Sequence, residues 1–281
     1  MKLTLGISPC PNDTFIFDAL VNGRLDTGDL RVEVVHEDVQ TLNEWALAGR
    51  LDVTKLSYGV LPEVTGEYAL LESGGALGRG VGPLLVTRPG AAFDPGRSSV
   101  AIPGEQTTAH LLFSLVHPGA TRKRFMVFSQ IEAAVARGEV DAGVIIHESR
   151  FTYAAKGLVK LLDLGEAWEQ RTGAPIPLGG IVARRSLGSQ LLRRLDGLIR
   201  ASVEAARAGG GGLSPYVKQH AQELEEAVMR QHIDLYVNEH SVALGAEGRR
   251  AVELLLSVHA RMNGRPSPAA AAIFAPHLLG G

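Results

Sequence analysis

One segment of this chain occurs twice. Residues 46–58 (ALAGRLDVTKLSY) align without gaps with residues 135–147 (VARGEVDAGVIIH). Each copy has the pattern of an amphipathic helix end, a glycine turn, an aspartate and a short apolar strand. Helix–glycine–strand joints are common in α/β proteins, so a chance match is the alternative explanation. Taken as a duplication, the pattern predicts an α/β chain with two similar halves.

Polar side chains follow both repeated strands. Lys55, Ser57 and Tyr58 end the first strand, and His147 and Glu148 end the second. Ligands of open α/β sheets bind at the carboxyl ends of strands. We therefore expect a ligand cleft between two domains.

Apolar strands next to glycine- and proline-rich stretches predict where the domains divide. Gly80–Arg88 runs into such a stretch, and Pro177–Arg184 has the same character. We predict a discontinuous first α/β domain over residues 1–88 and 184–281, and a second α/β domain over residues 89–183. Two crossing strands would form a double-stranded hinge, which suits closure about a ligand.

Periodicity predicts elements that frame these domains. A helix cap at Asn12 or Asp13 would start a helix over Thr14–Leu20. We expect another strand at Phe125–Phe128 and a helix over Pro215–Gln231.

Composition excludes several classes of protein. With 281 residues, 45% of them apolar, the chain can build a substantial core. Its formal net charge of −2 argues against nucleic-acid or membrane-surface partners. We find no run close to the ~18 apolar residues of a membrane span. The first apolar run meets Pro9 too early for a signal peptide, so we expect a cytoplasmic protein. The oligomeric state is not predicted.

Two predicted helices begin directly after strands. Their first residues are Asn12, Asp13, Thr14, Thr107 and Thr108. The backbone N–H groups and dipole of a helix N-terminus favour an anion, and threonine hydroxyls add hydrogen bonds. Such residues are also ordinary N-caps. The two roles are compatible, so both helix starts are candidate contacts for a substrate carboxylate.

Two further candidates are a lysine and a histidine. Lys55 interrupts an apolar strand and shares a face with Ser57. It needs a counter-ion, for which we favour a ligand carboxylate over a nearby acidic side chain such as Asp52. His147 suits a general base, because imidazole is largely neutral near pH 7. A hydrogen-bonded structural histidine is the alternative, and Glu148 is placed to tune the imidazole.

Other chemistries find little support in the sequence. Cys10, the one cysteine, follows a proline near a predicted helix N-terminus, where thiolates are stabilised. We favour a buried spectator thiol over a nucleophile. We find no close Cys/His cluster, HExxH motif, Walker A loop or strand-linked GxGxxG. The sequence therefore predicts neither a metal nor a cofactor.

Three motifs together resemble the 1,4-dihydroxy-6-naphthoate synthase family of the futalosine route to menaquinone. They are residues 8–15 (SPCPNDTF), 52–57 (DVTKLS) and 143–148 (GVIIHE), and the resemblance extends over essentially the whole chain. It implies a two-lobed fold like the type II periplasmic binding proteins, each lobe a mixed sheet flanked by helices.

The resemblance also implies a reaction and its residues. The substrate would be cyclic dehypoxanthinyl futalosine, and the products 1,4-dihydroxy-6-naphthoate and dihydroxyacetone. His147 would accept the proton. The implied substrate contacts are Lys55, Leu56, Ser57, Thr107 and Thr108.

Two alternatives stay open. One is a non-catalytic binding protein for a small carboxylate on the same scaffold, although such receptors normally carry an export signal or a lipid anchor. The other is the sibling chorismate dehydratase of the same pathway.

Overall fold

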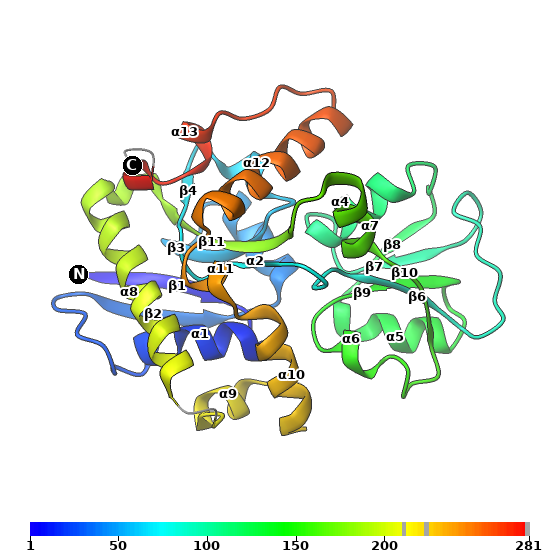
Figure 1. The fold of residues 1–281 in the computed structure, drawn as a ribbon, viewed down its shortest axis with the longest axis horizontal. Helices are drawn as coiled ribbons and strands as arrows, with labels where there is room; N and C mark the ends of the chain where they lie inside the picture. Colours follow the sequence, from blue (N-terminus) through cyan, green and yellow to red (C-terminus); the bar gives the residue numbers. More distant parts are fainter. Residues whose placement is uncertain (210–211, 222–224, 279–281) are drawn as a thin grey trace. The chain divides into compact units, whose positions relative to one another are not determined.

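The computed structural model describes residues 1–209, 212–221 and 225–278, and they fall into two units (Figure 1). Unit 1 contains residues 1–78 and 177–281, and unit 2 contains residues 79–176. The units divide after residues 78 and 176, whereas the sequence placed the seams after residues 88 and 183.

Unit 1 is built on a six-stranded mixed sheet. Its order is β2-β1-β3-β11-β4, with β5 also paired to β11. Parallel pairing joins β1 to β2 and β3, and β11 runs antiparallel to β3 and β4. The strands are β1 Lys2–Ile7, β2 Arg31–His36, β3 Val53–Ser57, β4 Tyr68–Leu70, β5 Ala76–Gly78 and β11 Ile176–Arg184.

Helices flank this sheet, and its main core lies between strands β1, β3 and β11 and the long helices. Ile7 of β1, Phe17 of α1 and Ile199 of α8 belong to one buried cluster. The helices of unit 1 are α1 Pro11–Val21, α2 Val39–Leu47, α3 Leu61–Val64, α8 Ser189–Ala208, α9 Pro215–His220, α10 Glu226–Tyr236, α11 Glu239–Val242, α12 Gly245–Met262 and α13 Ala270–Ile273, with 3₁₀ turns η1 Arg185–Leu187 and η2 Pro276–Leu278.

Unit 2 is built on a five-stranded mixed sheet of order β10-β6-β9-β7-β8. Parallel pairing joins β7 to β8 and β9, and β6 runs antiparallel to β9 and β10. The elements are β6 Leu84–Thr87, β7 Val100–Ile102, β8 Lys123–Phe125, β9 Ala142–Ile145, β10 Val159–Asp163, α4 Thr108–Val116, α5 Phe128–Ala136, α6 Ser149–Thr152 and α7 Leu164–Thr172. Its core contains Val86, Ile131, Val135 and Ile145.

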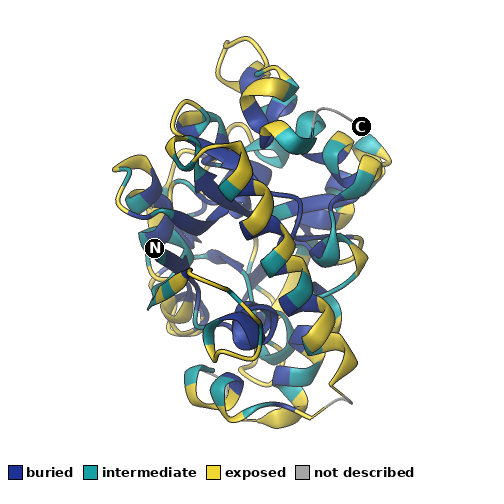
Figure 2. Ribbon diagram, turned by 90° about the vertical axis from the view of Figure 1, so that its left-hand side faces the viewer, coloured by how far each residue is buried: buried dark blue, intermediate teal, exposed yellow. Residues whose placement is uncertain are grey.

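Burial follows the amphipathic pattern in both units. Strand residues are mostly buried, and exposed residues gather in loops and on the outer faces of helices (Figure 2). Two mixed sheets flanked by helices confirm the predicted α/β class. Among the described residues, no helix is both long and apolar enough to span a membrane.

The duplicated segment has the same local structure in both units. In each copy a helix ends, a glycine with positive φ turns the chain, and a strand follows: Gly49 (φ 59°) precedes β3 and Gly138 (φ 76°) precedes β9. Glycine adopts such a φ without the penalty of a Cβ atom. The helix–glycine–strand prediction is confirmed for both copies.

The aspartate of each copy ties its strand to the neighbouring parallel strand. Asp52 accepts hydrogen bonds from the backbone N–H and the hydroxyl of Thr4, at 2.8 and 2.9 Å. Asp141 accepts the same pair from Ser99, at 2.7 and 2.8 Å. The shared aspartate therefore has the same structural role in both units.

Some predicted boundaries are wrong. Helix α1 begins at Pro11 with Cys10 as its N-cap, so neither Asn12 nor Asp13 caps it. Proline suits the first helical turn, where its missing N–H costs nothing. The strand predicted over Phe125–Phe128 ends at Phe125, and α5 begins at Phe128.

The predicted helix over Pro215–Gln231 comprises α9 and the first part of α10; residues 222–224 of that stretch lie outside the described residues. Helix α7 was missed by the sequence reading. Its N-cap is Asp163, whose side chain accepts from the backbone N–H groups of Gly165 and Glu166.

Candidate functional site

The candidate residues fall into two groups, one in each unit. The unit 1 group lies in the first turn of α1, after β1, and at the carboxyl end of β3; it consists of Asn12, Asp13, Thr14, Lys55, Leu56 and Ser57. The unit 2 group follows β7 and β9 and consists of Thr107, Thr108 and His147. Their contact with a substrate stays a prediction.

Lys55 forms a buried ion pair with Asp13. Its Nζ lies 2.6 Å from Oδ1 of Asp13, and the two side chains are only 7% and 2% exposed. The Asp13 carboxylate also accepts from the hydroxyl of Ser8 at 2.7 Å and from the amide of Asn12 at 2.9 Å. The partner is an acidic side chain, as the alternative prediction had it, but the example given, Asp52, is wrong: its carboxylate accepts hydrogen bonds from Thr4 instead.

Ser57 and Leu56 lie on the central strand β3 of the unit 1 sheet and are held there by hydrogen bonds and strand pairing. Asn43 of α2 donates from its amide to the Ser57 hydroxyl at 3.1 Å and accepts from the Ser57 backbone N–H at 2.8 Å. The Leu56 side chain is fully buried, and Leu56 pairs with Gly180 of β11. The sequence reading missed Asn43. A polar residue on the buried face of a helix, next to Leu42, is the signal that would have found it.

Asn12 connects the ion pair to α10. His232, which is fully buried, places Nε2 at 2.8 Å from Oδ1 of Asn12. Because the Asn12 amide donates to Asp13, its oxygen accepts and His232 donates. The hydroxyl of Thr14 donates back to the carbonyl of Cys10 at 3.1 Å. The first turn of α1 is therefore a bonded polar network.

The charge of Asp13 also acts on the neighbouring end of β2. Burial raises the pKa of Tyr216 to about 12, with further contributions from the carboxylates of Asp18 and Asp13. The phenol therefore stays protonated at neutral pH and can donate to His36 Nε2, 2.8 Å away. Burial lowers the pKa of His36, and the Asp13 carboxylate acts against this shift.

In unit 2, α4 begins as predicted at the threonine pair. Thr107 is the N-cap: its hydroxyl accepts from the backbone N–H of His110 at 3.2 Å and donates to the carbonyl of Gly104 at 2.8 Å. Thr108 is the first helical residue, and both threonines are buried. This confirms the N-cap expectation for Thr107.

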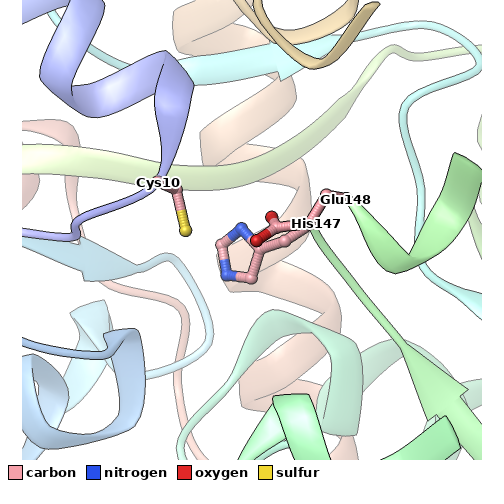
Figure 3. Close-up of side chains that lie close together, drawn as sticks. All are labelled: Cys10, His147 and Glu148. Atoms are coloured by element: carbon pink, nitrogen blue, oxygen red, sulfur yellow. The ribbon is translucent and has the colours of Figure 1, made fainter. Parts of the chain in front are cut away.

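His147 has an unusual backbone. Its φ of 56° makes it the one non-glycine residue with positive φ in the part of the chain that the structure describes. Its ring lies 4.8 Å from the ring of Phe128. Glu148 follows it directly in the chain (Figure 3). A left-handed conformation costs an L-residue about 1–2 kcal/mol. Such strain is found preferentially at functional sites.

Cys10, also drawn in Figure 3, is the N-cap residue of α1 in unit 1. Its side chain is buried, at 2% exposure.

Comparison with known sequences identifies the family. A sequence family described as menaquinone biosynthesis matches residues 3–261. The chain is 52% identical to a 1,4-dihydroxy-6-naphthoate synthase of Thermus thermophilus, over 95% of this chain and 97% of that protein. It is 51% identical to the enzyme of the same name from Streptomyces coelicolor, over 91% and 92%.

Comparison with solved structures identifies the fold. Protein AF1704 of Archaeoglobus fulgidus matches with a TM-score of 0.88 at 30% identity, over 94% of this chain and 98% of that one. The alkanesulfonate-binding protein SsuA of Xanthomonas axonopodis matches with a TM-score of 0.71 at 15% identity, over 97% and 98%. The second likeness concerns the fold alone.

These neighbours define the class: an α/β protein with the fold of the periplasmic binding proteins. Within that class, the chain belongs to the 1,4-dihydroxy-6-naphthoate synthase family of menaquinone biosynthesis. The family predicted from the three sequence motifs is confirmed.

Proposed function

We propose that this chain converts cyclic dehypoxanthinyl futalosine into 1,4-dihydroxy-6-naphthoate and dihydroxyacetone, with His147 as the general base. The activity is supported by the two relatives that carry this enzyme name at 52% and 51% identity over nearly their whole length. The proposed substrate contacts are Lys55, Leu56, Ser57, Thr107 and Thr108, with Asn12, Asp13 and Thr14 beside them.

The backbone of His147 carries the proposal for the base. A residue that only ends a strand has no need of a left-handed φ, and any strain there lowers stability. Here the strained residue is an imidazole at the carboxyl end of β9, the end at which ligands of such sheets bind.

The chemistry requires a base and a place for developing negative charge. The imidazole would take a proton from a carbon next to a carbonyl group. The electron pair left behind forms a new double bond in the ring system, and the pair of the breaking carbon–carbon bond leaves with the three-carbon fragment. That fragment becomes dihydroxyacetone by taking up a proton, which the imidazolium of His147 can return. Formation of an aromatic ring drives the reaction forward. The N-terminus of α4, with Thr107 as its cap, offers backbone N–H groups to an anionic group of the substrate.

The test is His147→Asn. Asparagine tolerates a left-handed backbone better than most residues, so this variant keeps the turn and removes the base. We expect kcat for cyclic dehypoxanthinyl futalosine to fall by about 10²–10⁴ while KM changes little. Release of 1,4-dihydroxy-6-naphthoate is the readout.

A second assay with chorismate as the only substrate separates this enzyme from its sibling dehydratase. Turnover of chorismate and not of the futalosine derivative would refute the proposed reaction. Turnover of the futalosine derivative by His147→Asn at the wild-type rate would refute the proposed base alone. A small-molecule carboxylate as the partner and a cytoplasmic location are part of the same proposal, since the named relatives are biosynthetic enzymes.

A further inference from the structure

One face of α5 contacts the chain at His147 and again just beyond it. Phe128 and Glu132 lie four residues apart on this helix, so they share a face. The Phe128 ring lies 4.8 Å from the His147 ring at an interplanar angle of 58°. The Glu132 carboxylate accepts from the hydroxyl of Ser149 at 2.7 Å. The helix thus holds the imidazole on one turn and the following segment on the next.

Glu132 is a carboxylate in a place where a carboxylate is costly. It is 3% exposed, and a buried charge destabilises a fold unless donors surround it. Its donors are Ser149 Oγ and Lys156 Nζ, both at 2.7 Å, with Thr152 Oγ1 at 3.5 Å. All three belong to α6 or the residues just after it. The carboxylate therefore fastens to α5 the segment that follows His147.

The other side of the same short helix is also anchored. Arg150 donates to the backbone carbonyl of Gly82 and pairs with Asp163 at 2.7 Å. On the amino side of His147, β9 is a central strand held by β6 and β7. A strained backbone persists only when its surroundings fix it. At His147 the surroundings fix the chain on both sides: β9 precedes this residue and the anchored α6 follows it.

We propose that Phe128 and Glu132 are positioning residues for His147. Glu132 acts through Ser149 to hold the turn at its left-handed φ, and Phe128 limits rotation of the imidazole. This inference rests on the proposed role of His147 as the base. A displacement of about 1 Å in a reacting group can cost about 10²-fold in rate. Loss of either contact should therefore lower kcat and leave KM nearly unchanged.

The main test is Ser149→Ala, which removes the hydroxyl and leaves His147 and Glu132 in place. Its matched control is Ser99→Ala. Ser99 makes the same kind of bond, hydroxyl to carboxylate at 2.8 Å, to Asp141 just before the other end of β9. Both variants are measured for kcat, KM and melting temperature with cyclic dehypoxanthinyl futalosine.

We expect both variants to melt a few degrees lower than the wild type. Only Ser149→Ala should lose activity, with kcat reduced about tenfold or more and KM within about twofold. Ser149→Thr, which restores the hydroxyl, should recover most of the lost kcat. Phe128→Leu should lower kcat in the same way, and it decides the matter if Ser149→Ala does not fold.

Other outcomes would overturn the inference. Equal losses of kcat in Ser149→Ala and Ser99→Ala would mean that both serines act only through stability. Wild-type kcat in both Ser149→Ala and Phe128→Leu, with His147→Asn inactive, would refute the positioning role and leave the base in place. Full activity of His147→Asn would refute the base itself, so the two proposals fail separately.

Discussion

Burial of the Tyr58 hydroxyl lowers the stability of the fold. The side chain is fully buried, and no hydrogen-bond partner for Oη is found among the described residues. Burial raises the pKa of this phenol well above its usual value, with the carboxylate of Glu72 adding to the effect. An unsatisfied buried hydroxyl lowers stability by about 1–3 kcal/mol.

Removing that hydroxyl should therefore stabilise the protein. We expect Tyr58→Phe to raise the free energy of unfolding by about 1 kcal/mol, measured by urea denaturation. Tyr68→Phe is the matched control, because Tyr68 donates to the Leu51 carbonyl at 2.6 Å and should lose about as much as Tyr58→Phe gains. A loss of stability in both variants would show that Tyr58 has a partner that matters.

Removing one partner of the ion pair between Lys55 and Asp13 should instead destabilise the protein. Lys55→Met leaves the Asp13 carboxylate buried with only neutral donors, which should cost about 3–5 kcal/mol of unfolding free energy. Adding Asp13→Asn removes the uncompensated charge and should recover part of the loss. If the double variant is no more stable than Lys55→Met alone, the pair is not coupled in the way the structure indicates.

The Lys55–Asp13 pair also shows which properties of a single residue can be predicted from the sequence and which cannot. The sequence showed that Lys55 needs a counter-ion, because the lysine interrupts an apolar strand. It did not identify Asp13, which lies 42 residues away and is brought to Lys55 by the pairing of β1 with β3. The candidate nearer in sequence, Asp52, accepts a hydrogen bond from the backbone N–H of Thr4 instead. Partners set by sheet pairing cannot be read from local spacing.

At the scale of elements, the C-terminal segment has a structural role that the sequence left open. Phe274 is 1% exposed and forms a bridge with Leu70 of β4. The next residue, Ala275, donates its N–H to the Leu70 carbonyl at 2.9 Å. His277 of η2 then lies 2.9 Å from the carboxylate of Asp196 on α8. The segment thus extends one edge of the sheet and docks on a helix.

Phe274→Ala should measure how much this docking contributes. Loss of a fully buried phenylalanine typically costs about 3–5 kcal/mol, so we expect a loss of that size in unfolding free energy. Phe125→Ala provides the control, because Phe125 is 45% exposed and should cost much less. Similar small losses in both variants would mean that the C-terminal segment contributes little to unit 1.

At the scale of the whole molecule, the repeat predicted the architecture better than the turn residues predicted its seams. The repeat is local, and each copy folds by the same physics: a glycine turn, an aspartate bonded to the neighbouring strand, and a central strand. The boundaries between the two units depend instead on which strands pair with each other. Strand β6 lies before the glycine- and proline-rich stretch, yet it pairs with β9 and β10 of unit 2.

The two units have separate hydrophobic cores, which makes the repeat testable. Thr4→Val removes the hydroxyl bonded to Asp52 in unit 1, and Ser99→Ala removes the one bonded to Asp141 in unit 2. Each bond to a carboxylate contributes about 1.5–3 kcal/mol. We expect each variant to lower amide-exchange protection chiefly in the strands of its own unit.

The aspartate in unit 2 adds a pH dependence to that test. The N–H and hydroxyl of Ser99 hold the pKa of Asp141 below its usual value. A lowered carboxyl pKa contributes stability above the unfolded pKa, and this contribution is lost as the pH falls through the folded value. Unit 2 of the wild type should therefore lose protection on acidification more steeply than unit 2 of Ser99→Ala. Hydrogen exchange resolved by peptide, at neutral pH and at a pH below the usual aspartate pKa of 3.8, measures this difference. Equal acid sensitivity would show that the shared aspartate is not what secures the repeated strand.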